Sequence, residues 1–384
     1  MKIYLDNSAT TKPYQEVVEE MKAALTEDFY NPSSIYDGGV DISRKIEGYR
    51  SLIADTLGCK PKELLFTSGG TESINTAIFS LKNSRKKHII TSMAEHSATL
   101  EAMKKMEKLS FEVTYLKPSK DGSIKPEQVL DALREDTCLI SLMAVNNELG
   151  SVTDVIGIAK QVKKKQDVLI HVDAVQAYLK QPLKLYDKVI DFLSISAHKI
   201  HGPKGVGVLY HNEEALLLPL IVGGGQEGGQ RSGTLNTPGI YGMGKAIELF
   251  YPDLQNHTEK IRRRKEQLRD KILEEIDFVK VLSPEDGICH ILNLSFVGLR
   301  GEILLHSLEK EGIYVSTGSA CSSKKSYSHV LNALELGREI KEGAIRFSLS
   351  EETTEEEIDK VVEALKKNVV TIRRIMKMGK RRNV

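Results

Sequence analysis

Phe192-Leu193-Ser194-Ile195-Ser196 is a short apolar run typical of a buried strand, and it leads directly into Ala197-His198-Lys199. Similar runs precede it and alternate with amphipathic helical patterns between residues 15 and 250: Glu63–Thr67, His88–Ser92, Phe111–Tyr115, Leu139–Val145 and Val168–Val172. This alternation predicts an α/β fold with a mostly parallel sheet and crossover helices. Because ligands bind beyond the carboxyl ends of such strands, the residues that follow each run are the first candidates for a site.

The composition of the chain excludes several classes of function. Its 384 residues, 40% of them hydrophobic, can bury a large core. With 54 basic and 53 acidic residues, nothing in the charge indicates a nucleic acid or membrane partner. The longest apolar stretch, residues 215–222, is too short to span a bilayer, and Asp6 interrupts any secretory signal. Four widely spaced cysteines fit a reducing compartment, so we expect a cytoplasmic protein.

A long charged helix, predicted from about Asn256, separates two groups of elements. We predict a large domain over residues 15–255 and a smaller α+β domain made of residues 1–14 and 256–384. The second group combines expected strands and helices at Ile288–Phe296, Arg300–Glu311, Ile313–Ser316, Ser328–Leu336, Ala344–Ser350 and from Thr354 onward.

Two strand ends carry residues that suit an aldehyde cofactor. Lys199 stands between apolar strand residues and a glycine-rich turn, where a lysine loses its proton more readily and can form a Schiff base. Asp173 ends the apolar Val168–Val172 run, and a buried acid needs a cationic partner such as a pyridinium nitrogen. Gln176 could then contact the hydroxyl of the same ring. Taken singly, Lys199 is better explained as a surface lysine, and Asp173 could equally be a helix cap.

A third strand end offers a site for phosphate. Thr67-Ser68-Gly69-Gly70-Thr71 precedes a helical pattern that starts near Ile74. Glycines let the backbone approach an anion, and a helix amino terminus presents free N–H groups, although Gly-Gly-Thr is also an ordinary turn. The three strand ends together indicate pyridoxal 5'-phosphate.

Further candidates surround this set. His96 follows the His88–Ser92 strand, where an imidazole could stack on the ring and move protons. Arg231-Ser232-Gly233-Thr234 offers an anion contact that a second subunit could receive. Cys321 stands in a polar segment, Thr317–Ser326, where Lys324 and Lys325 favour the thiolate. Cys59, Cys138 and Cys289 have apolar neighbours and are expected to be small core residues.

These residues resemble the cysteine desulfurases of the NifS/IscS type, in the aminotransferase class V family. The similarity runs nearly end to end through short segments: Tyr4–Thr11, Asn31–Ser34, Thr67–Ser73, Glu95-His96, Val145–Gly150, His171–Gln176, Ser196–Lys199, Arg231–Thr234 and Gly318–Cys321. The resemblance implies fold-type I architecture and a homodimer. It also implies L-cysteine as substrate and a sulfur-acceptor protein, for iron–sulfur cluster assembly, another thio-cofactor or tRNA thiolation.

The resemblance also assigns roles position by position. Lys199 would form the Schiff base, and Cys321 would be the nucleophile that carries a persulfide. His96 would be the acid–base group stacked on the ring. The remaining cofactor contacts would be Asp173 at the ring nitrogen, Gln176 at the ring hydroxyl, and Gly70, Thr71, Ser196, His198 and a partner's Thr234 at the phosphate. Asn147 and Arg346 would bind the substrate carboxylate.

Two features depart from the family pattern. Gly228 follows Gln226-Glu227 where the family often has arginine, and the tail, residues 378–384, lacks the aromatic, acidic ending of some scaffold-docking members. Alternatives within the same fold are a selenocysteine lyase or another enzyme with this cofactor. A regulator without turnover is a third alternative, but it has no need for Lys199, Asp173, His96 and Cys321 together.

Overall fold

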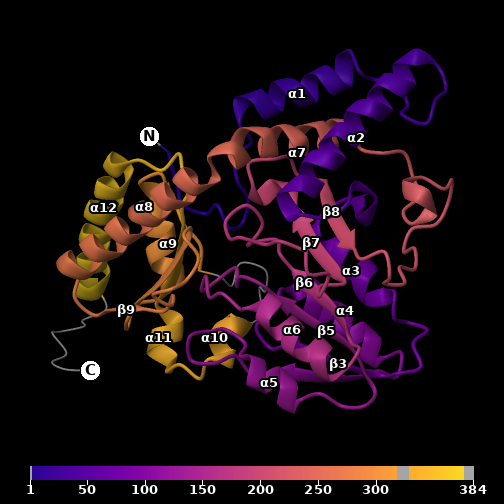
Figure 1. Ribbon diagram of the computed structural model, residues 1–384. Helices are drawn as coiled ribbons and strands as arrows, with labels where there is room; N and C mark the ends of the chain where they lie inside the picture. The colour runs from indigo at the N-terminus through magenta and orange to yellow at the C-terminus, as the bar shows by residue number, and fades with distance from the viewer. Residues whose placement is uncertain (1, 318–327, 376–384) are drawn as a thin grey trace.

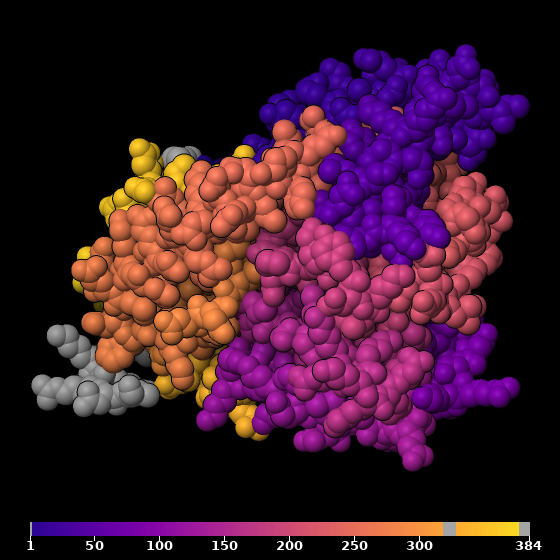
Figure 2. Space-filling view, viewed as in Figure 1, coloured from indigo at the N-terminus to yellow at the C-terminus, as the bar shows by residue number. Residues whose placement is uncertain are grey.

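The computed structural model describes residues 2–317 and 328–375 of the chain. Two bodies lie side by side (Figure 1): an α/β body with the long sheet, and a smaller body of helices over short strands. Figure 2 shows them in contact along one side, the first indigo to pink and the second orange to yellow. Among the described residues, no helix has both the length and the apolar character that crossing a bilayer requires.

The larger body is built on a seven-stranded sheet in the order β2-β8-β7-β6-β5-β3-β4. All neighbouring pairs are parallel except those of β8, which runs antiparallel to β2 and β7. The predicted α/β class with a mostly parallel sheet is confirmed. The strands are β2 (Leu64–Thr67), β3 (His88–Ser92), β4 (Glu112–Leu116), β5 (Thr137–Met143), β6 (Leu169–Asp173), β7 (Phe192–Ser196) and β8 (Gly207–His211).

Strand β8 was not predicted, because the glycine-rich segment that precedes it indicated only a turn in which the chain reverses direction. The first residue of the strand, Gly207, lies where two segments meet. A Cβ on Gly207 would lie 2.6 Å from the Ile195 carbonyl oxygen and 2.7 Å from the Cα of Gly69. Only glycine therefore allows β8 to bring the glycine turn after β2 beside the end of β7.

Helices cover the sheet and connect its strands. Helices α1, α2 and α7 lie together at one edge (top of Figure 1), while α3 and α4 pack on each other and α5 packs on α6. The bounds are α1 (Gln15–Thr26), α2 (Asp37–Leu57), α3 (Gly70–Phe79), α4 (Ser97–Glu107), α5 (Pro126–Asp131), α6 (Val155–Lys165) and α7 (Thr237–Phe250).

The smaller body contains a three-stranded antiparallel sheet in the order β12-β10-β9 and a parallel pair, β1 with β11. The β1 pairing places the first residues of the chain beside this body. The division into domains at residues 255 and 256 stays a prediction. The elements are β1 (Ile3–Tyr4), α8 (Leu254–Glu275), β9 (Val279–Val281), β10 (Ile291–Phe296), α9 (Gly301–Lys310), β11 (Ile313–Tyr314), α10 (His329–Ala333), α11 (Arg338–Glu342), β12 (Ala344–Ser348) and α12 (Glu355–Ile375).

Candidate active site

A cavity of about 400 Å³ lies beyond the carboxyl ends of β2, β5, β6 and β7, where Ser316 and Arg346 of the smaller body meet the sheet. The predicted site residues that border it are Gly70, Thr71, His96, Asn147, Asp173, Gln176, Ser196, His198, Lys199 and Arg346. Thr234 does not border it and lies in an exposed loop. Cys321 lies outside the described residues. Of the other cysteines, Cys138 and Cys289 are buried as predicted, but Cys59 is only partly buried.

One end of the cavity is suited to an anion. Helix α3 begins after Gly69, which has a φ of 147° and makes no side-chain cap, so the first N–H groups of the helix stay available. A Cβ on Gly70 would lie 2.8 Å from Cγ2 of Val175, which explains the second glycine. Ser196 and His198 border the cavity from the end of β7. Burial, with the nearby Lys199 charge, lowers the pKa of His198 to about 4, so its ring is neutral.

Asp173 supplies a buried acid at the end of β6. It is 5% exposed and accepts a hydrogen bond of 3.0 Å from the Val175 N–H. Burial raises the pKa of Asp173, while the nearby charges of His96 and Lys199 lower it. A cation inside the cavity would therefore stabilise the Asp173 carboxylate.

Lys199 follows β7 with its amine inside the cavity. The amine donates to the carbonyl oxygens of Ser8 and Ala9, each at 2.7 Å. Burial lowers the pKa of Lys199 to about 7, helped by the positive charges of Arg346 and Lys180. A large fraction of the amine is thus neutral near pH 7, as a nucleophile or a base must be.

His96 both borders the cavity and caps α4. Its Nδ1 accepts a hydrogen bond of 3.1 Å from the Ala98 N–H, which places the proton of the neutral ring on Nε2. Burial lowers the pKa of His96, so the neutral form prevails. Nε2 can take up a proton only if the ring's own proton moves to Nδ1, and the ring must then give up its hydrogen bond from Ala98.

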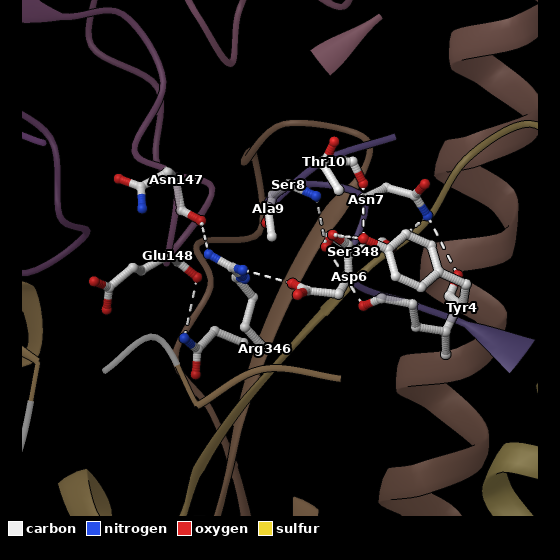
Figure 3. A network of polar contacts seen from close by, with 12 residues as sticks. Tyr4, Asp6, Asn7, Ser8, Ala9, Thr10, Asn147, Glu148, Arg346 and Ser348 are labelled. Atoms are coloured by element: carbon white, nitrogen blue, oxygen red, sulfur yellow. Dashed lines mark hydrogen bonds and ion pairs between the residues drawn. The ribbon is translucent and has the colours of Figure 1, made fainter. Parts of the chain in front are cut away.

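Arg346 is held from two sides (Figure 3). One guanidinium nitrogen lies 2.6 Å from Asp6 Oδ1 and another donates at 2.8 Å to the backbone oxygen of Asn147. The side-chain amide of Asn147 points away from the guanidinium in this view. Arg346 is 5% exposed, and its Nε has no hydrogen-bond partner among the described residues. A carboxylate would give this guanidinium a partner of matching planar geometry.

Gln176 is fixed by two neighbours that the sequence did not indicate. Its Nε2 donates to the Ser8 oxygen at 2.8 Å, and its Oε1 lies 3.1 Å from Nε2 of His290. Asp6 and Ser8 belong to a segment that resembles the family but was assigned no role from the sequence. No feature of the sequence indicated a role for His290. The cavity thus combines an anion site, a buried acid, a neutral amine and a fixed arginine.

Comparisons with known proteins identify the family to which the chain is similar. The aminotransferase class-V family model matches residues 3–361. The cysteine desulfurase IscS of Dictyoglomus turgidum is 42% identical over 97% of this chain and 96% of its own, and that of Methanosarcina thermophila is 41% identical over 97% and 93%. Among solved structures, a NifS-like protein superposes with a TM-score of 0.91 at 38% identity, over 97% of this chain and 100% of the other. SspA in complex with cysteine has a TM-score of 0.82 at 36% identity, over 92% and 100%.

Proposed function

The chain belongs to the aminotransferase class-V family, and we propose that it is a cysteine desulfurase that uses pyridoxal 5'-phosphate to convert L-cysteine into L-alanine and a transferable sulfur. The observation that carries the proposal is the single cavity in which Lys199, Asp173, the α3 amino terminus and Arg346 come together. Each supplies a different function that such a reaction requires.

The residues present suit pyridoxal 5'-phosphate. The free N–H groups of α3, with Ser196 and His198, would hold the phosphate, Asp173 would face the ring nitrogen, and Lys199 would hold the cofactor covalently. When bound, this cofactor supplies an electron sink that makes the Cα proton of an amino acid acidic. A protonated ring nitrogen also provides the cation that the buried Asp173 needs.

The chain's own groups then bind the substrate and move its protons. Arg346 holds the carboxylate of L-cysteine, and Asn147 lies beside it. Once the amine of L-cysteine has taken its place on the cofactor, the Lys199 amine is free and would remove the Cα proton; its lowered pKa keeps a large fraction of it neutral near pH 7. His96 borders the same cavity and would lie against the ring of the bound cofactor, where it would exchange a proton with the substrate once its bond to Ala98 is released.

Sulfur leaves by attack of the Cys321 thiolate on the substrate's sulfur. A sulfur–sulfur bond forms, the substrate's carbon–sulfur bond breaks, and the electron pair stays with the carbon, which is protonated and released in alanine. The resulting persulfide passes its outer sulfur to a thiol of an acceptor protein. Iron–sulfur cluster assembly, synthesis of another thio-cofactor and tRNA thiolation are the processes that consume such sulfur.

A second copy of the chain completes the phosphate site. Thr234 is exposed and does not border the cavity of its own chain, although the resemblance places it at a phosphate. The same loop is tied to α3 by Arg231, whose guanidinium lies 2.9 Å from Glu72. Exposed apolar side chains precede it at Leu220 and Val222. An apolar rim beside an exposed hydroxyl suits a homodimer in which Thr234 reaches the partner's cavity.

The test is an assay of the purified protein with L-cysteine and a reductant, following alanine and sulfide while the visible spectrum is recorded. We expect a yellow protein that forms both products in equal amounts. Cys321→Ala should stay yellow and bind cysteine but form no alanine, and Lys199→Ala should lose the visible band. A yellow protein that turns over L-selenocysteine and ignores L-cysteine would reject the proposal in favour of a selenocysteine lyase.

A further inference from the structure

His290 joins the two bodies beside Gln176, a residue that borders the cavity. It lies immediately before β10 in the smaller body, and its Nε2 is 3.1 Å from Oε1 of Gln176, which follows β6 in the large sheet. Both side chains are buried, with 1% of His290 and 5% of Gln176 exposed. Buried polar side chains normally have a hydrogen-bond partner, and each of these two has the other.

The hydrogen bonds that connect Ser8, Gln176 and His290 determine which atom of each residue is the donor and which is the acceptor. The Ser8 carbonyl oxygen can only accept, so the amide nitrogen of Gln176 must face it, at 2.8 Å. The amide oxygen of Gln176 then faces His290 and can only accept, so His290 must carry its proton on Nε2. Its Nδ1 has no partner in the part of the chain that the structure describes.

His290 keeps this tautomer as a neutral ring. Burial lowers its pKa far below the usual range, and the charges of Lys180, Lys265, Arg346 and Lys199 act in the same direction. A neutral imidazole has one N–H, and His290 donates that N–H to the amide oxygen of Gln176.

We propose that His290 is a positioning residue: its Nε2–H locks the Gln176 amide so that the second amide hydrogen of Gln176 points into the cavity and donates to the ring oxygen of the bound cofactor. The inference rests on the proposed function, because it requires pyridoxal phosphate in the cavity. It differs from that proposal in the residue it concerns, since His290 does not border the cavity.

The orientation of the amide matters because the ring oxygen carries negative charge. A hydrogen bond donated to that oxygen stabilises its deprotonated, negatively charged form. It therefore weakens the binding of the proton that the oxygen shares with the Lys199 nitrogen. Without a donor at position 290 the amide oxygen of Gln176 is buried unpaired, and turning it toward the cavity would place two oxygens against each other. The shared proton should then be held more tightly.

The charged groups around that proton stay the same when the neutral ring at position 290 is replaced by another neutral side chain. Lys199 faces Arg346 from β12, Lys180 from the turn after β6, Asp6 from the amino-terminal segment and Asp173 from β6. If a substitution at position 290 changes the pKa of the bound cofactor, the cause is therefore the orientation of the Gln176 amide and not a change in charge.

The experiment is a pH titration of the visible absorbance of the protein loaded with pyridoxal phosphate. We expect His290→Phe to raise the pKa of the chromophore by about one pH unit, the size of one hydrogen bond. His290→Asn keeps an N–H donor and should restore the parent value. His88→Phe removes an equally buried ring, bonded to Thr114 and Thr137 and away from the cavity, and should leave the titration unchanged.

A second background separates positioning from general damage. In Gln176→Leu the amide is gone, so adding His290→Asn or His290→Phe should produce no further shift. An unchanged chromophore pKa in His290→Phe, or an equal shift in both backgrounds, would overturn the inference. If His290→Phe does not fold, the comparison of His290→Leu with His290→Asn decides in the same way. A parent protein that binds no cofactor would instead refute the proposed function.

Discussion

The lowered pKa of Lys199 predicts how the cofactor-free protein takes up pyridoxal phosphate as the pH is varied. Only the neutral amine attacks an aldehyde. An ordinary lysine with a pKa of 10.5 is neutral in about one molecule in 3000 at pH 7, whereas the pKa of about 7 for Lys199 makes about half of the molecules reactive. Burial is the main cause, and the Arg346 charge adds to it.

The assay is rapid mixing of cofactor-free protein with excess pyridoxal phosphate between pH 6 and 9, following the visible absorbance. We expect the rate to rise up to about pH 7 and then level off. The control is the same reaction with Nα-acetyl-lysine. Its exposed side-chain amine should react about tenfold faster with each pH unit throughout this range. In Arg346→Gln the plateau should move to higher pH, because a positive charge beside the amine is lost.

A rate that climbs in parallel with the Nα-acetyl-lysine control through pH 9 would refute the reasoning. It would mean that the Lys199 amine is solvated in solution in spite of its contacts with the Ser8 and Ala9 oxygens. A plateau that stays in place in Arg346→Gln would leave burial as the sole cause of the shift.

Three further predictions concern single side chains. Asp173→Asn should still bind the cofactor but slow alanine formation at least about a hundredfold in single-turnover measurements, since the ring nitrogen loses its carboxylate. Arg346→Lys should raise the KM for L-cysteine about tenfold with a smaller change in kcat, because lysine cannot form a planar pair of hydrogen bonds. Burial opposes ionisation of Glu351, but bonds to His201 and Tyr14 outweigh it and hold its pKa at about 2. Unfolded glutamate titrates near 4.5, so this stabilisation is present above pH 4.5 and is lost as the pH falls toward 2. Glu351→Gln should therefore lower the free energy of unfolding by about 3 kcal/mol at pH 7 and by less than half as much at pH 3, as measured with urea; equal losses at the two pH values would contradict this.

The large sheet and its site could be predicted because their signals are local. An apolar run of strand length identifies β3 and β7 to the residue, and a parallel sheet brings the ends of its strands to one edge wherever they stand in the chain. Lys199, Asp173 and Gly70 could therefore be assigned to one site before any distance was known.

Contacts made by the backbone or across the two bodies left no such signal. The Ser8 and Ala9 oxygens that hold the Lys199 amine belong to the main chain, and every residue type has that oxygen. Neither a periodicity nor a spacing connects His290 with Gln176, because they flank β10 and β6, strands of two different sheets. Strand β8 was missed for a related reason, since its first residue, Gly207, makes a close approach to Gly69 that only the folded chain reveals.

The segment from Asp6 to Ala9 explains why these unpredicted contacts occur together. Ser348 of β12 fixes the segment, since its oxygen accepts from the Asn7 N–H and its Oγ from the Ser8 N–H, so the segment follows the smaller body. From there Asp6 pairs with Arg346, and the Ser8 oxygen accepts from both Lys199 and Gln176. On binding the proposed cofactor, Lys199 would leave that oxygen to Gln176 alone. The position of the smaller body is thereby linked to the Lys199 amine, the Arg346 guanidinium and the Gln176 amide through four consecutive residues.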